Sequence, residues 1–83
     1  MKVTVKLFAL LGRHLPAGSA GNAATVPAEA GSSVADVLAG FGLTERECHL
    51  VLLNGNFVPP DARGATLVGD GDVVSVWPPI GGG

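Results

Sequence analysis

The residues of this chain whose types and spacing suggest chemistry are its last seven, WPPIGGG at 77–83. Pro78 and Pro79 lack backbone donors and favour an extended course, so they would act as a stiff spacer. Three glycines follow, Gly81, Gly82 and Gly83, and without side chains they are thin enough for a narrow channel. Extended, the stretch from Trp77 would reach about 20 Å. We therefore expect the carboxylate of Gly83 to react inside another protein while the domain docks elsewhere.

The usual catalytic and metal-binding patterns do not occur in the sequence. Cys48 and His49 are adjacent, but neighbours on a strand point to opposite faces, so we expect an inert thiol beside a surface histidine. One cysteine and two histidines are too few for a structural zinc site. The GDGD at 69–72 lacks the other ligands of a calcium loop and predicts a turn. No phosphate-binding loop motif is present.

Composition and charge indicate a small globular domain that binds other proteins. The 83 residues suffice for one domain with one small core. Only 14% are charged, against about 25% in typical domains, which favours exposed apolar surface and therefore a partner. The net charge of -2, with five scattered basic residues, argues against nucleic acid as that partner. Lone basic residues such as Arg13, His14 and Arg63 are expected to be solvated.

The cellular environment is suggested by cysteine content and hydropathy. A single cysteine, Cys48, excludes an internal disulfide and fits a reducing cytoplasm. No stretch approaches the roughly 20 apolar residues of a membrane span. We expect a cytoplasmic protein that contacts neither membrane nor nucleic acid.

Alternation of apolar and polar residues predicts five strands. They are expected at 2–8, 23–28, 49–53, 56–58 and 72–77. Asn54-Gly55, between the third and fourth of these, is the strongest short-range hairpin signal. After the first strand, Leu10, Leu11 and Leu15 would anchor a short helical turn.

One amphipathic helix is expected in SSVADVLAGFGL at 32–43. Ser33 can cap it, and Asp36 three residues later completes a capping-box pattern. The helix carries one apolar stripe, made of Val34, Val37, Leu38 and Phe41. At about eight residues it is too short to persist alone, so it must pack on a sheet.

Strand pairs that flank one helix predict a two-layer α+β domain. The first and last strands are the most hydrophobic, so we place them centrally and side by side in a mixed sheet. This arrangement is the β-grasp, or ubiquitin-like, topology. We expect residues 1–78 to form the domain and residues 79–83 to form a flexible tail.

With this order of elements and this ending, the chain resembles the MoaD/ThiS family of β-grasp sulfur carrier proteins. The resemblance spans essentially the whole chain. It is carried by KVTVKLFALL, SSVADVLAGFGL, VLLNGNFV and, most specifically, DGDVVSVWPPIGGG. The start and the Asn-Gly hairpin are most similar to the small subunit of molybdopterin synthase.

The resemblance implies a mechanism in which this chain is a co-substrate and not an enzyme. An E1-like adenylating enzyme would use ATP to activate the carboxylate of Gly83, and a sulfur donor would convert it to a thiocarboxylate. A second partner, such as the large subunit of molybdopterin synthase, would accept the sulfur. The catalytic groups would lie on the partners, and this chain would bind no cofactor of its own.

The resemblance also implies a docking face. The family's aromatic or aliphatic docking positions match Phe8, Phe57 and Trp77 here, and the adjoining Pro78, Pro79 and Ile80 would contact the partner as well. The alternative is that these three aromatic side chains pack inside the domain. Phe41, on the helix stripe, is assigned to the core.

Other functions stay open. The same chemistry would serve thiamine, cysteine or secondary-metabolite synthesis. The tail also suits a ubiquitin-like protein modifier, which would be joined through Gly83 to lysines of other proteins. A plain binding module with an inert tail is a third class.

Overall fold

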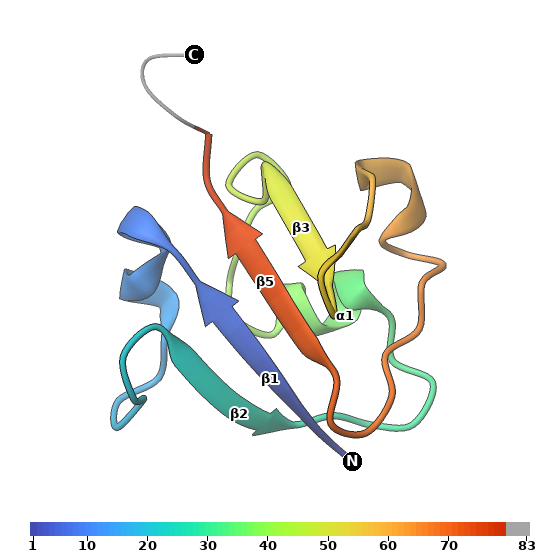
Figure 1. The fold of residues 1–83 in the computed structure, drawn as a ribbon, viewed down its shortest axis with the longest axis horizontal. Helices are drawn as coiled ribbons and strands as arrows, with labels where there is room; N and C mark the ends of the chain where they lie inside the picture. The colour runs from blue at the N-terminus through green and yellow to red at the C-terminus, as the bar shows by residue number, and fades with distance from the viewer. Residues whose placement is uncertain (80–83) are drawn as a thin grey trace.

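The structure is a computed structural model, and it describes residues 1–79. These residues form a five-stranded mixed sheet with α1 packed against one of its faces (Figure 1). The elements are β1 (Lys2–Leu7), η1 (Ala9–His14), β2 (Ala23–Pro27), α1 (Val34–Ala39), β3 (Leu50–Leu53), β4 (Asn56–Phe57), η2 (Pro60–Ala62) and β5 (Val73–Trp77). The strand order in the sheet is β2-β1-β5-β3-β4.

The centre of the sheet is the parallel pair β1 and β5, in which Thr4 lies opposite Val73 and Leu7 opposite Val76. β2 and β3 flank this pair in antiparallel orientation. Parallel strands need cover on the face that carries their apolar side chains, and α1 supplies it. The predicted α+β β-grasp fold, with the first and last strands side by side, is confirmed.

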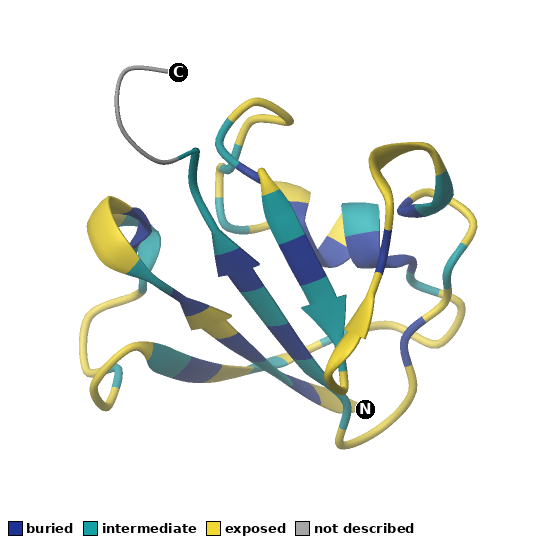
Figure 2. Cartoon of the chain, turned by 45° about the horizontal axis from the view of Figure 1, so that its top comes forward, coloured by how far each residue is buried: buried dark blue, intermediate teal, exposed yellow. Residues whose placement is uncertain are grey.

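The core lies between the sheet and α1. Side chains of β1 and β5 alternate between buried and more exposed positions, as the banding of these strands shows (Figure 2). The residues that point into the core from these two strands are Val3, Val5, Leu7, Val74 and Val76. Val51 of β3 joins them. This period of two is what the sequence pattern predicts for strands covered on one face.

Helix α1 begins as predicted and ends earlier. The Ser33 hydroxyl accepts a hydrogen bond from the Asp36 amide at 3.1 Å, and the Ser33 amide donates to the Asp36 carboxylate at 3.0 Å. These bonds lower the pKa of Asp36, the backbone bond most. The helix has six residues instead of about eight. It ends before Gly40, and Gly42 takes the left-handed conformation with φ +76°.

The hairpin between β3 and β4 confirms the Asn-Gly prediction. Asn54 and Gly55 both have positive φ, 50° and 85°, as a type I′ turn requires. The Asn54 side chain also reaches the start of β5, where it accepts from the Val73 amide at 2.9 Å and donates to Asp72 at 3.0 Å. The turn therefore ties β3 to β5 as well as to β4.

The segment after β1 differs from expectation at Leu10, which is 77% exposed and anchors nothing. The turn is a 3₁₀-helix, η1, in which Leu11 is buried. A 3₁₀-helix repeats every three residues. Leu10 and Leu11 therefore point to different sides, and only Leu11 reaches the core.

Arg63 also differs from expectation, because it is buried, at 6% exposed, and not solvated. Its guanidinium donates to the carbonyl oxygens of Cys48 at 2.6 Å and Val58 at 3.2 Å. These carbonyls lie beyond the ends of β3 and β4, and a buried carbonyl needs a donor.

The Cys48 side chain is buried, as expected for an inert thiol, and burial raises the pKa of the thiol.

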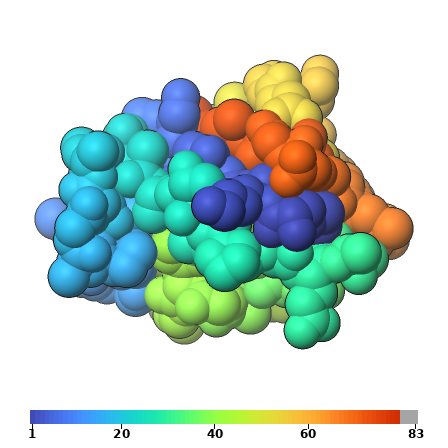
Figure 3. Space-filling view, turned by 90° about the horizontal axis from the view of Figure 1, so that it is seen from below, coloured from blue at the N-terminus to red at the C-terminus, as the bar shows by residue number. Residues whose placement is uncertain are grey.

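The start of β1 lies at the end of the molecule opposite the C-terminal end of β5. Figure 3 shows it between the segment that leads into β5 and the segment that follows β2. The carbonyl of Met1 accepts from the Ala28 amide, and the carbonyl of Lys2 accepts from the Gly71 amide, both at 2.8 Å. The predicted turn at 69–72 is present, closed by the Asp72 carboxylate, which accepts from the Gly69 amide.

Candidate functional site at the end of β5

The site begins where β5 ends, because the predicted tail follows directly. The Phe8 amide donates to the Val76 carbonyl, and the His49 amide donates to the Trp77 carbonyl, both at 3.1 Å. The backbone is therefore held from both sides up to Trp77. Pro78 and Pro79 follow, half-buried and without regular structure. The predicted site residues Ile80, Gly81, Gly82 and Gly83 lie outside the described residues.

Phe8 and Trp77 meet at this point. Their rings stack with centroids 4.2 Å apart and planes 3° from parallel. Both side chains are half-buried, on the side of the sheet opposite the core, because their neighbours Leu7 and Val76 point into the core. Sequence reasoning predicted both residues at the site, and the structure brings them into contact.

Phe57, the third predicted aromatic residue, lies on the same face and is 59% exposed. The register connects it to Trp77. Leu50 lies opposite Trp77, while Leu52 lies opposite both Ser75 and Phe57. These residues therefore form one apolar band that crosses β1, β5, β3 and β4. We call this band the open face, and it consists of Phe8, Trp77, Leu50, Leu52 and Phe57. None of the three aromatic side chains is part of the buried core.

Sequence reasoning missed Leu50 and Leu52. The signal was available, because LVLL at 50–53 is apolar on both faces of its strand. Val51 and Leu53 pack toward the core, so the two alternate leucines must face outward. A two-layer domain, with its single helix on one face of the sheet, has no layer on the other face to cover them.

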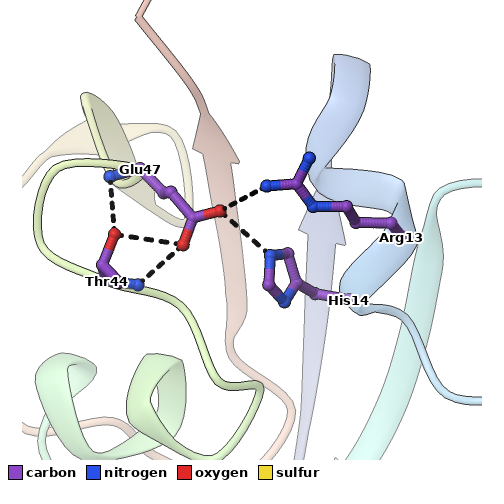
Figure 4. Close-up of polar contacts among 4 residues, drawn as sticks. All are labelled: Arg13, His14, Thr44 and Glu47. Atoms are coloured by element: carbon purple, nitrogen blue, oxygen red, sulfur yellow. Dashed lines mark hydrogen bonds and ion pairs between the residues drawn. The ribbon is translucent and has the colours of Figure 1, made fainter.

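Beside the end of β5, Glu47 joins two segments of the chain (Figure 4). One carboxylate oxygen, Oε2, accepts from Arg13 Nη2 and from His14 Nε2, both at 3.0 Å. The other, Oε1, accepts from the Thr44 amide and hydroxyl, both at 3.0 Å. An ionised carboxylate only accepts, so the histidine nitrogen is the donor.

These bonds lower the pKa of Glu47 to about 2, the Thr44 amide contributing most and His14 next. His14 is therefore half-buried and bonded, against expectation, and Arg13 is exposed as expected but paired with Glu47. No local pattern could reveal the contact, because the partners lie 33 or 34 residues apart. The bridge ties η1, which follows β1, to the loop that precedes β3. It therefore fixes the segments on both sides of the β5 end.

Residues 1–79 contain neither a metal-ligand cluster nor a membrane-spanning helix. No group of three or more metal-ligating side chains gathers in this part of the chain. None of its helices is long and apolar enough to span a membrane. A shallow pocket of about 440 Å³ lies between β2 and α1, and none of the predicted site residues lines it.

Three solved structures share this fold, each matching over 100% of both chains. SAMP1 from Haloferax volcanii superposes with a TM-score of 0.69 at 24% identity. The thiamine biosynthesis protein ThiS from Geobacter metallireducens gives 0.65 at 29% identity. The complex of subunits 1 and 2 of molybdopterin-converting factor from Helicobacter pylori contains a chain that gives 0.61 at 23% identity. The chain thus has the ubiquitin-like β-grasp fold of the ThiS and MoaD carriers.

The sequence makes the assignment more specific. The sequence model of the ThiS family matches residues 16–83, which is most of the chain and includes the glycine tail. The chain therefore belongs to the ThiS family, within the MoaD/ThiS group that its motifs resemble. No curated protein matches it.

Proposed function

We propose that this chain is a sulfur carrier whose Gly83 carboxylate is adenylated and then converted to a thiocarboxylate. The observation that carries the proposal is the family match, which continues through the tail to residue 83. The hydrogen bonds that hold β5 up to Trp77 support it. A tail anchored in this way can extend from a rigid domain into a partner's active site.

The chemistry follows from the weak reactivity of a carboxylate. In the activating enzyme, a carboxylate oxygen would attack the α-phosphorus of ATP and release pyrophosphate. A sulfide equivalent from a donor would then displace AMP from the acyl-adenylate, leaving a thiocarboxylate. This chain would supply the reacting carboxylate and its thin approach, and the partners would supply acid, base and metal chemistry.

We infer that the open face is where a partner docks. Its three best-placed anchors are Phe8 and Trp77, which stack beside the tail, and the exposed Phe57. Aromatic side chains contribute strongly to interfaces when a partner covers them. The molybdopterin-converting factor of Helicobacter pylori was solved as a complex of two subunits, and we propose a comparable pairing with a sulfur-accepting enzyme here.

We propose that the sulfur is used in molybdopterin synthesis, because the first strand and the hairpin resemble those of the molybdopterin synthase small subunit. Thiamine synthesis is the second candidate, favoured by the 29% identity to ThiS from Geobacter metallireducens. Reconstituting sulfur transfer with each acceptor enzyme in turn separates them, because only the true acceptor should consume the thiocarboxylate.

Removing Gly82 and Gly83 tests the carrier role. The truncated chain should lose adenylation and sulfur transfer completely, while its free energy of unfolding stays within about 0.5 kcal/mol of the full chain. Both are measured on the same preparation. Normal sulfur transfer by the truncated chain would contradict the proposal. Loss of lysine-linked conjugates in cell extract, with no loss of sulfur transfer, would favour a ubiquitin-like modifier.

A further inference from the structure

The short helix η1 exposes an apolar and a cationic side chain together. Residues three apart eclipse in a 3₁₀-helix, so Leu10 and Arg13 lie on one side of η1. Leu11 and His14 lie on the other, where they are buried and half-buried. Leu10 is 77% exposed, and the Arg13 side chain is 64% exposed despite its bond to Glu47. Among the large apolar residues of 1–79, Leu10 is the most exposed.

This exposed side of η1 adjoins the end of β5. Leu10 lies two residues after Phe8, whose ring stacks on Trp77. Between them, Ala9 has φ +53°, a left-handed conformation that an alanine seldom adopts. The chain holds this strained residue where β1 gives way to η1, and strain of this kind tends to be retained at functional sites.

Charge distinguishes this end of the molecule from the rest. Lys6, Arg13 and Arg46 are exposed on the segments around the β5 end, against two carboxylates, Glu45 and Glu47. The other side chains of the chain include two cations and five carboxylates. The side chains around the β5 end thus sum to +1, while those of the rest of the chain sum to −3. Such a surface complements a partner surface that carries carboxylates.

We propose that Leu10 and Arg13 form a second docking site, the η1 site, which fits an apolar pocket rimmed by carboxylates on the enzyme that activates the tail. The inference rests on the proposed function. The activating enzyme is chosen because every recipient considered above requires the adenylated tail, whichever acceptor follows. The η1 site would engage that enzyme beside the tail, outside the open face.

The test uses the full chain and the purified adenylating enzyme from the same organism. Carrier-dependent exchange of pyrophosphate into ATP gives KM and kcat for the carrier. Leu10→Ser should raise KM about tenfold, as expected for the loss of one buried leucine contact. It should leave kcat within about twofold, because Leu10 does not touch the reacting carboxylate. Leu67→Ser is the matched control, since Leu67 is 60% exposed beside the N-terminus of α1.

Arg13→Gln provides a second variant. Wild-type KM should rise with ionic strength, and Arg13→Gln should flatten that dependence. An unchanged KM for Leu10→Ser, or an equal rise for Leu67→Ser, would overturn the η1 site while leaving the carrier role intact. Unchanged adenylation with weakened binding of the acceptor enzyme would also overturn it. If the wild-type chain supports no exchange, the proposed function fails, and the η1 site fails with it.

Discussion

At the scale of single residues, Glu47 is where pH should act on this fold. Its carboxylate accepts four hydrogen bonds, and its pKa falls to about 2 from an ordinary value of 4.5. A depressed pKa means that the folded state favours the ionised form. The hydrogen bonds of the ionised Glu47 carboxylate therefore stabilise the folded state fully above pH 4.5, and this contribution is lost as the pH falls toward 2.

Glu47→Gln should consequently be less stable than the wild type at neutral pH, and the difference should vanish between pH 4.5 and 2. Denaturant unfolding of both proteins across this range measures the effect. Subtracting the two curves removes the contributions of Asp36 and Asp72, whose pKa values are also lowered. Glu45→Gln, an exposed carboxylate of the same loop, serves as the control. A constant difference over the whole pH range would count against the bridge.

Arg63 is the second residue whose surroundings predict a large effect. Arg63→Met removes the donors that serve the buried carbonyls of Cys48 and Val58. We expect the free energy of unfolding to fall by about 2–4 kcal/mol. Arg46→Met, at an exposed position, should change it by less than about 0.5 kcal/mol. Equal effects of the two substitutions in urea denaturation would mean that Arg63 is not structurally important.

At the scale of elements, the open face separates binding from stability. Phe57→Ala should weaken binding of the sulfur-accepting enzyme about tenfold or more. It should lower the free energy of unfolding by less than about 1 kcal/mol, because Phe57 is 59% exposed. Paired binding titrations and denaturation curves measure both. A loss of about 3–5 kcal/mol in stability would instead assign Phe57 to the core. Leu67→Ala, with matched exposure, should leave binding unchanged.

The elements that local signals determine could be predicted from the sequence. Alternation at Val3, Val5 and Leu7 predicted β1, Asn54-Gly55 predicted the hairpin, and Ser33 with Asp36 predicted the start of α1. Each depends on residues only a few positions apart. These signals also placed the three aromatic residues of the candidate site near strand ends.

The contacts that depend on distant segments could not be predicted. The bridge from Arg13 and His14 to Glu47 joins segments more than thirty residues apart. The burial of Arg63 depends on where the ends of β3 and β4 leave unpaired carbonyls. Leu10 is exposed because adjacent residues of η1 point to different sides and the side of Leu11 faces the core, and the run of leucines did not indicate which side that would be.

At the scale of the whole molecule, the features of the site gather at one end. The sheet holds β5 from both sides up to Trp77, the open face begins with the Phe8–Trp77 stack, and Glu47 fixes the flanking segments. The opposite end carries the 69–72 turn and the start of β1. In the proposed function, the domain is thus a rigid base that presents a reactive tail next to its docking surfaces.

The most direct test of the central claim is to locate sulfur on the chain. The protein is produced together with its adenylating enzyme and a sulfur donor, its intact mass is measured, and the added mass is mapped by fragmentation. Mapping is necessary because oxidation of Met1 or Cys48 changes the mass almost as much as exchange of oxygen for sulfur. We predict that the sulfur lies on the carboxyl group of Gly83. An unmodified Gly83, in the presence of an active partner and ATP, would contradict the sulfur-carrier role.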